Sequence, residues 1–229
     1  MSLDNALRWT ECLLAFALLL QSIEHLARPR ASVETLLFGL RLGLCALAMP
    51  GIAGPWAIWG LWLTSIMLLW RYDGPYNGGA DRMGLLVLTM VSVALAWPAH
   101  AGLAMGYLAV QVTLSYFVSG WVKLRNPNWR DGTALANVFR FSAYPVSDDL
   151  RALAHRPGLL FCAGWAVILL EVFFPLAILH RNLLALALGA TATFHFVNAV
   201  VFGLNRFFWV WLSGYPALFW LQERLSLLY

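Results

Sequence analysis

Long apolar stretches separated by short polar breaks run along the whole chain of 229 residues. Each stretch has roughly the 17 to 25 residues that a helix needs to cross a bilayer. Proline, glycine and charged residues stand in the breaks and end the helices. The pattern predicts eight transmembrane helices, over residues 7–27, 33–49, 56–72, 82–97, 101–122, 159–179, 182–204 and 207–221.

The predicted fold is an all-α, polytopic membrane helix bundle that forms a single domain over residues 1–229. Only 11% of the residues are charged and 61% are hydrophobic, whereas soluble domains carry about 25% charged residues. The boundary at Leu204 is the weakest, because Asn205 and Arg206 fall either in a turn or inside one long broken helix. After the fifth helix, the polar segment 124–157 predicts a short amphipathic or re-entrant element, or else an ordered connector.

Lysine and arginine are concentrated on one side of the predicted bundle. The connections 28–32, 71–82, 123–157 and 205–206 hold most of them, so the positive-inside rule places this side in the cytoplasm and both termini outside. The formal net charge of +4 suits loops on an anionic lipid surface and gives no indication of nucleic acid. We therefore expect a multi-pass protein of the cell's inner (plasma) membrane, with the lipid bilayer as its first partner.

A polar stripe crosses the fifth apolar stretch. Tyr107, Gln111, Ser115, Ser119 and Lys123 recur every four residues and share one helix face. Such a stripe faces protein or a water-filled cavity, because hydrocarbon offers it no hydrogen-bond partner. Two interpretations of Lys123 stay open: an ammonium that snorkels to the interface, or a partly buried amine that acts as a base.

Glu171 lies near the middle of an otherwise apolar stretch. A carboxylate at that depth is protonated or paired, and Arg41, Lys123 and His195 are the candidate partners. Arg41 is also a candidate partner for Glu24. Glu171 is read either as part of a functional site or as half of an ion pair that holds two helices together.

Thr191, His195, Asn198 and Asn205 form a second polar face, because their offsets of four, three and seven residues place them on one side of a single predicted helix. His195 is interpreted either as a hydrogen-bonded packing residue or as a functional base. No second histidine stands at metal-ligand spacing, so we predict no metal site.

Two pairs of glycines have the GxxxG spacing that lets helices approach closely. They are Gly39 with Gly43, and Gly102 with Gly106. We interpret both pairs as packing devices.

The segment 116–124, YFVSGWVKL, followed by NWRDG at 128–132, resembles the HTTM (horizontally transferred transmembrane) domain. This domain is the membrane part of vitamin K-dependent gamma-carboxylase and of many small bacterial proteins. Support comes from NGGAD at 77–81 before a helix, from Glu171 with Pro175, and from Phe194 with His195 in the penultimate helix. Asp81 in that motif also has the position of a helix cap.

The resemblance implies a chemistry for the site. In the carboxylase, the lysine of the motif is the proposed base that deprotonates reduced vitamin K, and by motif that role falls on Lys123. Glu171 and His195 are expected around the same cavity as further catalytic residues. A reduced, vitamin K-like quinone would be the cofactor, bound by Gln111, Ser115, Ser119, Asn198 and Trp129.

Two classes of function follow from the resemblance. One is an enzyme that couples proton abstraction to redox chemistry on a lipid-soluble molecule, with a partner protein or peptide as substrate. The other is a non-catalytic membrane accessory, maturation or immunity factor. A transporter is less favoured, because the sequence shows no inverted repeat.

Two features separate the chain from the carboxylase. The chain ends at Tyr229 without the large domain that engages the carboxylase's polypeptide substrate, so protein carboxylation is not expected. The charge count also places Lys123 on the cytoplasmic side, whereas the carboxylase acts on the lumenal face.

Overall fold

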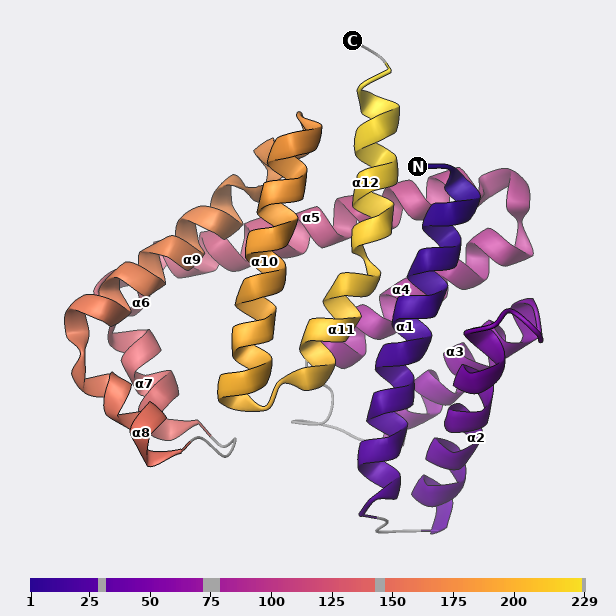
Figure 1. The fold of residues 1–229 in the computed structure, drawn as a ribbon, viewed down its shortest axis with the longest axis horizontal. Helices are drawn as coiled ribbons and strands as arrows, with labels where there is room; N and C mark the ends of the chain where they lie inside the picture. Colours follow the sequence, from indigo (N-terminus) through magenta and orange to yellow (C-terminus); the bar gives the residue numbers. More distant parts are fainter. Residues whose placement is uncertain (29–31, 72–78, 143–146, 228–229) are drawn as a thin grey trace. The chain divides into compact units, whose positions relative to one another are not determined.

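The computed structural model describes residues 1–28, 32–71, 79–142 and 147–227, and every element in these ranges is helical (Figure 1). The first half contains α1 (Leu3–Leu26), α2 (Ser32–Ala48), α3 (Pro55–Arg71), α4 (Gly79–Ala96), η2 (Pro98–His100) and α5 (Ala101–Arg125). The second half contains α6 (Pro127–Arg130), α7 (Thr133–Phe141), α8 (Asp148–Arg151), η3 (Ala152–His155), α9 (Pro157–Ala177), α10 (Arg181–Phe202), α11 (Asn205–Ser213) and α12 (Tyr215–Leu225). The all-α fold class is confirmed.

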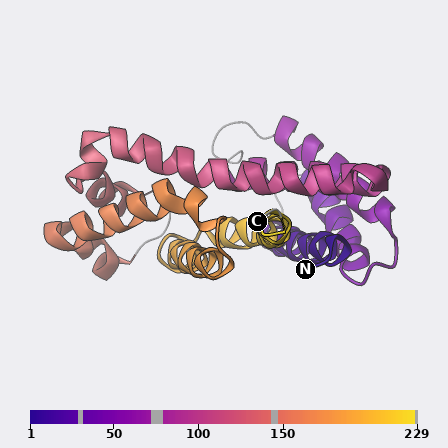
Figure 2. The ribbon, with the colours of Figure 1, turned by 90° about the horizontal axis from the view of Figure 1, so that it is seen from above.

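The chain forms two compact units. The first unit combines Met1–Val110 with Arg206–Arg224, and the second unit is mainly Gln111–Asn205. Helix α5 is continuous (Figure 2) and contributes its first part to one unit and its remainder to the other. The prediction of a single domain over residues 1–229 stays a prediction.

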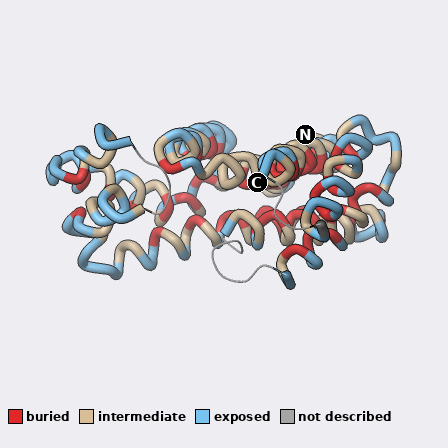
Figure 3. The backbone as a smooth tube through the Cα atoms, turned by 90° about the horizontal axis from the view of Figure 1, so that it is seen from below, coloured by how far each residue is buried: buried red, intermediate tan, exposed pale blue. Residues whose placement is uncertain are grey.

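The first unit is built around a four-helix arrangement, in which α1 and α3 each contact both α2 and α4. Helix α1 turns one face inward because Ala6, Thr10, Leu14 and Leu18 recur every four residues, and all four are buried. In Figure 3, buried stretches alternate with exposed ones along the helices. A cluster of small residues, Ala94, Ala101 and Ala104, closes one end of its core.

The second unit is organised by α9, which contacts α6, α7, η3 and α10. At the corner between α6 and α7, Gly132 has a φ of +84°, and a Cβ there would lie 3.1 Å from the backbone nitrogen of Phe161 on α9. The Nε1 of Trp165 donates to the carbonyl of Arg130 over 3.0 Å. These contacts hold the α6–α7 corner against α9.

Asp131 lies just before α7, outside the apolar helices, and its side chain bonds to the first residue of α7. Its carboxylate accepts the backbone N–H of Thr133 over 2.8 Å. Because this hydrogen bond favours the charged form, it holds the pKa of the Asp131 carboxyl below its usual value.

Among the described residues, five helical segments are long and apolar enough to cross a membrane: Leu3–Leu26, Gly79–Ala96, Pro98–Arg125, Pro157–Ala177 and Arg181–Phe202. The predicted count of eight spans is not confirmed. Helices α2 and α3 each have 17 residues in the described structure, which at 1.5 Å per residue rise about 25 Å, less than the roughly 30 Å of bilayer hydrocarbon.

The prediction of one last helix over residues 207–221 is wrong. The chain forms α11 and α12 instead, with a turn at Gly214 between them. Pro216 in the first turn of α12 has no backbone N–H to donate into α11, so the helix restarts there. Before them, α10 ends at Gly203 in the left-handed region with a φ of +68°, which resolves the boundary near Leu204 as a break.

The segment 124–157 forms the short helices α6, α7, α8 and η3 in its described part. It is therefore structured over most of its length. A re-entrant position in the bilayer is not confirmed and stays a prediction.

Candidate functional site

Lys123 and Glu171 form an ion pair inside the second unit. The Nζ of Lys123, in the last turn of α5, lies 2.6 Å from the Oε2 of Glu171 in the second half of α9. The side chains are only 15% and 5% exposed. Of the three candidate partners for Glu171, the structure therefore selects Lys123, and the Lys123 ammonium is directed at this carboxylate.

Ser119 connects the two charged groups. Its hydroxyl accepts from the Nζ of Lys123 over 2.6 Å and donates to the Oε1 of Glu171 over 3.3 Å. A further, longer contact of 3.5 Å joins the Lys123 Nζ to the Ser119 carbonyl. Because an ammonium has three protons to donate, these contacts engage the whole of the Lys123 head group.

The rest of the predicted stripe is not part of this cluster. The hydroxyl of Ser115 donates to the Gln111 carbonyl of its own helix over 2.8 Å. In the described structure, neither the Gln111 nor the Ser115 side chain bonds to Lys123 or Glu171. Their assignment to a cofactor site stays a prediction.

Trp129 adds an aromatic face to the cluster. The Lys123 Nζ lies 5.3 Å from the centroid of the Trp129 ring, within the range of a cation–π interaction. Trp129 is held by its position in α6, which the contacts of the α6–α7 corner fix against α9. The structure therefore brings this predicted residue beside Lys123.

Gly120 allows α5 and α9 to approach at the ion pair. A Cβ on Gly120 would lie 2.7 Å from both the Cβ of Glu171 and the backbone nitrogen of Val172. Since real Cβ atoms do not approach so closely, only glycine fits without movement of a helix. This close approach places the short Ser119 side chain within reach of Glu171.

His195 belongs to a separate polar pair. Its Nε2 lies 2.9 Å from the hydroxyl of Tyr116, and both residues are buried. The Tyr116 ring also packs on Phe174, with ring centroids 4.4 Å apart. Tyr116 precedes Lys123 on α5 by two helical turns, and the Lys123 charge acts electrostatically on the buried His195 ring.

Sequence reasoning missed Tyr116 as a functional candidate. Its offsets of three and seven residues from Ser119 and Lys123 place it on the same face of α5. That spacing could have identified Tyr116 as a candidate from the sequence.

Asn198 takes part in the end of α10 through its backbone. Its carbonyl accepts from Gly203 and Leu204 as the helix stops. The described hydrogen bonds do not bring its side chain to the Lys123 cluster, and its assignment to a cofactor site stays a prediction.

In chemical terms, the cluster is a buried, hydrogen-bonded ion pair. The 2.6 Å separation between Nζ and Oε2 allows one proton to move between them without a change in net charge. The described residues contain no group of three or more histidine, cysteine, aspartate or glutamate side chains placed to hold a metal ion.

Five apolar helices of membrane-spanning length and a buried ion pair between two of them define a multi-pass helical membrane protein. A family model for the HTTM domain matches residues 99–222, which is more than half of the chain. The chain belongs to the HTTM family.

The match includes all of the second unit's large helices and therefore the Lys123–Glu171 cluster. No curated protein shows a significant match to the chain. Among solved structures there is likewise none.

Proposed function

We propose that this protein is an enzyme of the inner membrane that binds a reduced, vitamin K-like quinone and uses Lys123 as a base. The observation that carries the proposal is the 2.6 Å pair of Lys123 and Glu171, held within two helices that are long enough to cross a bilayer. A buried charge pair costs desolvation energy, and a function in proton transfer explains why it is placed there.

The side chains at the Lys123 cluster are of the chemical types that a quinol would need, an amine and an aromatic ring. A reduced quinone would supply an acidic hydroxyl group and two electrons. Lys123 offers an amine to that hydroxyl, and Trp129 offers an aromatic face 5.3 Å from the same nitrogen. The Lys123 side chain as a whole retains 15% exposure.

Lys123 becomes a base by transferring a proton first. When Nζ passes one proton to the Oε2 of Glu171, the ion pair becomes a neutral amine and a neutral carboxylic acid. This step suits a low-dielectric site because neither product carries a charge. The neutral amine would then accept a hydroxyl proton from the bound quinol, and Ser119, which lies 2.6 Å from Nζ, would keep that nitrogen in position. A partner protein or peptide would be the substrate that consumes the activated molecule.

One observation favours the alternative of a non-catalytic accessory, maturation or immunity factor. All three protons of the Lys123 ammonium are engaged by Glu171 and Ser119. In that case the ion pair is structural: it holds α5 against α9 where the two helices cross at Gly120.

Binding of a short-chain naphthohydroquinone to the purified full-length protein under anaerobic conditions tests the proposal. Lys123→Met removes the base, and Arg125→Gln is the matched control, because it removes an exposed cation two residues away on the same helix. We expect saturable binding in the wild type and in Arg125→Gln, and at least tenfold weaker binding in Lys123→Met. Equal binding by all three proteins, or none by the wild type, would assign Lys123 to the structural link.

A further inference from the structure

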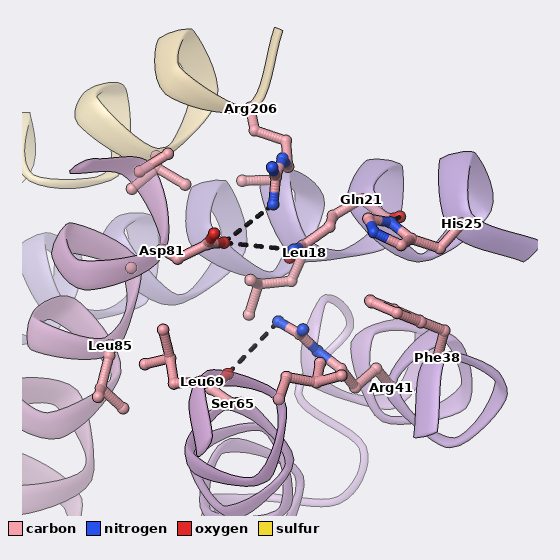
Figure 4. Close-up of a pocket in the computed structure, with 15 residues that line it drawn as sticks. Leu18, Gln21, His25, Phe38, Arg41, Ser65, Leu69, Asp81, Leu85 and Arg206 are labelled. Carbon is pink, nitrogen blue, oxygen red and sulfur yellow. Dashed lines mark hydrogen bonds and ion pairs between the residues drawn. The ribbon is translucent and has the colours of Figure 1, made fainter. Parts of the chain in front are cut away.

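A pocket in the first unit contains a buried arginine that the Lys123 site does not involve. The pocket lies between α1, α2, α3, α4 and α11 (Figure 4). Arg41 of α2 is 2% exposed and lines this pocket. Almost all of its residues lie before residue 99, outside the part of the chain that the HTTM model matches.

Arg41 has little to compensate its charge. Its Nη2 donates to the hydroxyl of Ser65 over 3.4 Å, and its Nε has no hydrogen-bond partner in the described structure. The Phe38 ring lies 5.8 Å from its Cζ, near the outer limit of a cation–π contact. Among the described residues, neither of the expected partners, Glu24 and Glu171, forms an ion pair with it.

The acidic side chain in the pocket, Asp81, is already bonded to other residues. Asp81, in the first turn of α4, accepts from the Nη1 of Arg206 over 2.9 Å and from the Nε2 of Gln21 over 3.3 Å. Asp81 was predicted to cap a helix, and its carboxylate bonds to the side chains of Arg206 and Gln21. Residues 77–78 of the NGGAD motif lie outside the described ranges. Two arginines and one aspartate leave the lining of the pocket with a net charge of +1.

A buried cation without a counter-ion is unfavourable, because burial removes its hydration and a neutral hydroxyl does not replace it. An anion that enters the pocket would remove this deficit. Guanidinium groups match the planar oxygens of carboxylates and phosphates, to which they donate two parallel hydrogen bonds. The Nε and the Nη groups of Arg41 supply that fork.

The size of the pocket limits the ligand. Its volume is about 40 Å³, and on the same measure one water needs roughly 10–15 Å³. The space therefore fits a group of a few heavy atoms and not the ring system of a quinone. Apolar side chains, including Leu18, Leu68 and Leu85, line the rest of the pocket.

We propose that this pocket is a binding site for a monoanionic oxyanion, a carboxylate or a phosphodiester, which Arg41 and Ser65 hold. The anion's single charge balances the net charge of the lining. Its source is either a soluble anion or the head group of an anionic lipid, since both offer the same oxygens to Arg41.

Thermal unfolding of the full-length protein in a neutral detergent tests the site. The probes are acetate, inorganic phosphate and dioctanoyl phosphatidylglycerol, and dioctanoylglycerol serves as the uncharged control for the acyl chains. We expect at least one anionic probe to raise the Tm of the wild type by roughly 3–6 °C at a tenfold excess over Kd. A response to the lipid alone identifies a head group, and a response to acetate or phosphate identifies a soluble anion.

Two variants and a control locate the response. Arg41→Gln removes the charge, and Ser65→Asp places a carboxylate beside Arg41, so both variants should unfold at an unchanged or higher Tm without ligand and lose the response. Arg71→Gln is the matched control, because Arg71 on α3 is exposed and pairs with Glu34 outside the pocket. Ser65→Asp keeps the test decisive even if Arg41→Gln does not fold. An equal response in Arg41→Gln or Ser65→Asp, or no response of the wild type to any anion, overturns the proposal.

Discussion

Gly120 of α5 lies so close to Glu171 of α9 that a Cβ added to Gly120 would stand 2.7 Å from the Glu171 Cβ. The closest helix contact in the second unit and its buried charge pair therefore coincide. A change at Gly120 alters the packing at this crossing, whereas a change at Lys123 alters its electrostatics.

Gly120→Ala should destabilise the protein by about 1–3 kcal/mol, because the added methyl group forces α9 away from α5. The change in free energy of unfolding is measured by thermal or denaturant unfolding in detergent. Gly43→Ala is the control, since no atom lies within 4 Å of a Cβ built there in the middle of α2. It should be neutral or stabilise by about 0.5–1 kcal/mol. Equal effects of the two changes would contradict the close approach.

Lys123→Met and Glu171→Leu should each destabilise by about 3–5 kcal/mol, because each leaves its partner buried without a complete set of bonds. The double variant Lys123→Met with Glu171→Leu should recover most of that loss, since it buries no charge. A double-mutant cycle on unfolding free energies measures the coupling. The more accessible pair of Arg71 and Glu34, whose side chains are 44% and 19% exposed and 3.5 Å apart, is the control and should show a coupling of about 0–1 kcal/mol.

Tyr116→Phe should destabilise by about 1–3 kcal/mol, because it deletes the hydroxyl that lies 2.9 Å from the Nε2 of His195 in a buried environment. Tyr107→Phe, on the same helix, is the control, since Tyr107 is 49% exposed and its change should stay within about 0.5 kcal/mol. Unfolding of both variants gives the comparison. A Tyr116→Phe protein as stable as the wild type would show that the hydrogen bond contributes nothing net.

Gly203→Ala should cost about 1–2 kcal/mol, because its φ of +68° is unfavourable for any residue with a Cβ. Gly189→Ala in the interior of the same helix has open space around the new methyl group and should be neutral or stabilising. Unfolding midpoints of the two variants distinguish backbone strain from a general effect of alanine. Matching behaviour would argue against a left-handed end of α10.

Periodicity predicted which residues share a face, and it was most informative for Lys123 and Glu171. It placed Ser119 and Lys123 on one stripe and required a partner for Glu171, and the structure supplies Lys123 from the three candidates. It did not distinguish Ser119, whose hydroxyl reaches another helix, from Ser115, whose hydroxyl bonds to its own. That difference depends on the proximity of α9, which no pattern within α5 contains.

Glycine spacing was a poor guide to helix contacts. Gly39 and Gly43 have the GxxxG spacing, yet no atom lies within 4 Å of a Cβ built at either of them in the described structure. A Cβ built on Gly102 or Gly106 would lie 3.6 Å or 3.9 Å, respectively, from the nearest atom of the Trp220 ring. The tightest approach is at Gly120, a single glycine without a partner at that spacing, because what permits close approach is the absence of a Cβ at the crossing point.

The hydropathy count of eight spans is not confirmed, since five of the described helices have membrane-spanning length and apolarity. It joined α11 and α12 into one stretch because Gly214 and Pro216 interrupt a helix without lowering its hydrophobicity. The pocket around Arg41 was not predicted at all. It combines residues from α1, α2, α3, α4 and α11, and the pairing of Asp81 with Arg206 spans 125 positions.

That separation of 125 positions sets an order for biosynthesis. At roughly 5–20 residues per second, the ribosome produces Arg206 about 6–25 s after Asp81. The first unit contains both residues, whereas nearly all of the second unit is made between them. Residues Met1–Val110, which form most of the first unit, are therefore made before the arginine partner of the Asp81 carboxylate exists. During this interval Gln21 is the partner of Asp81 that the chain already contains.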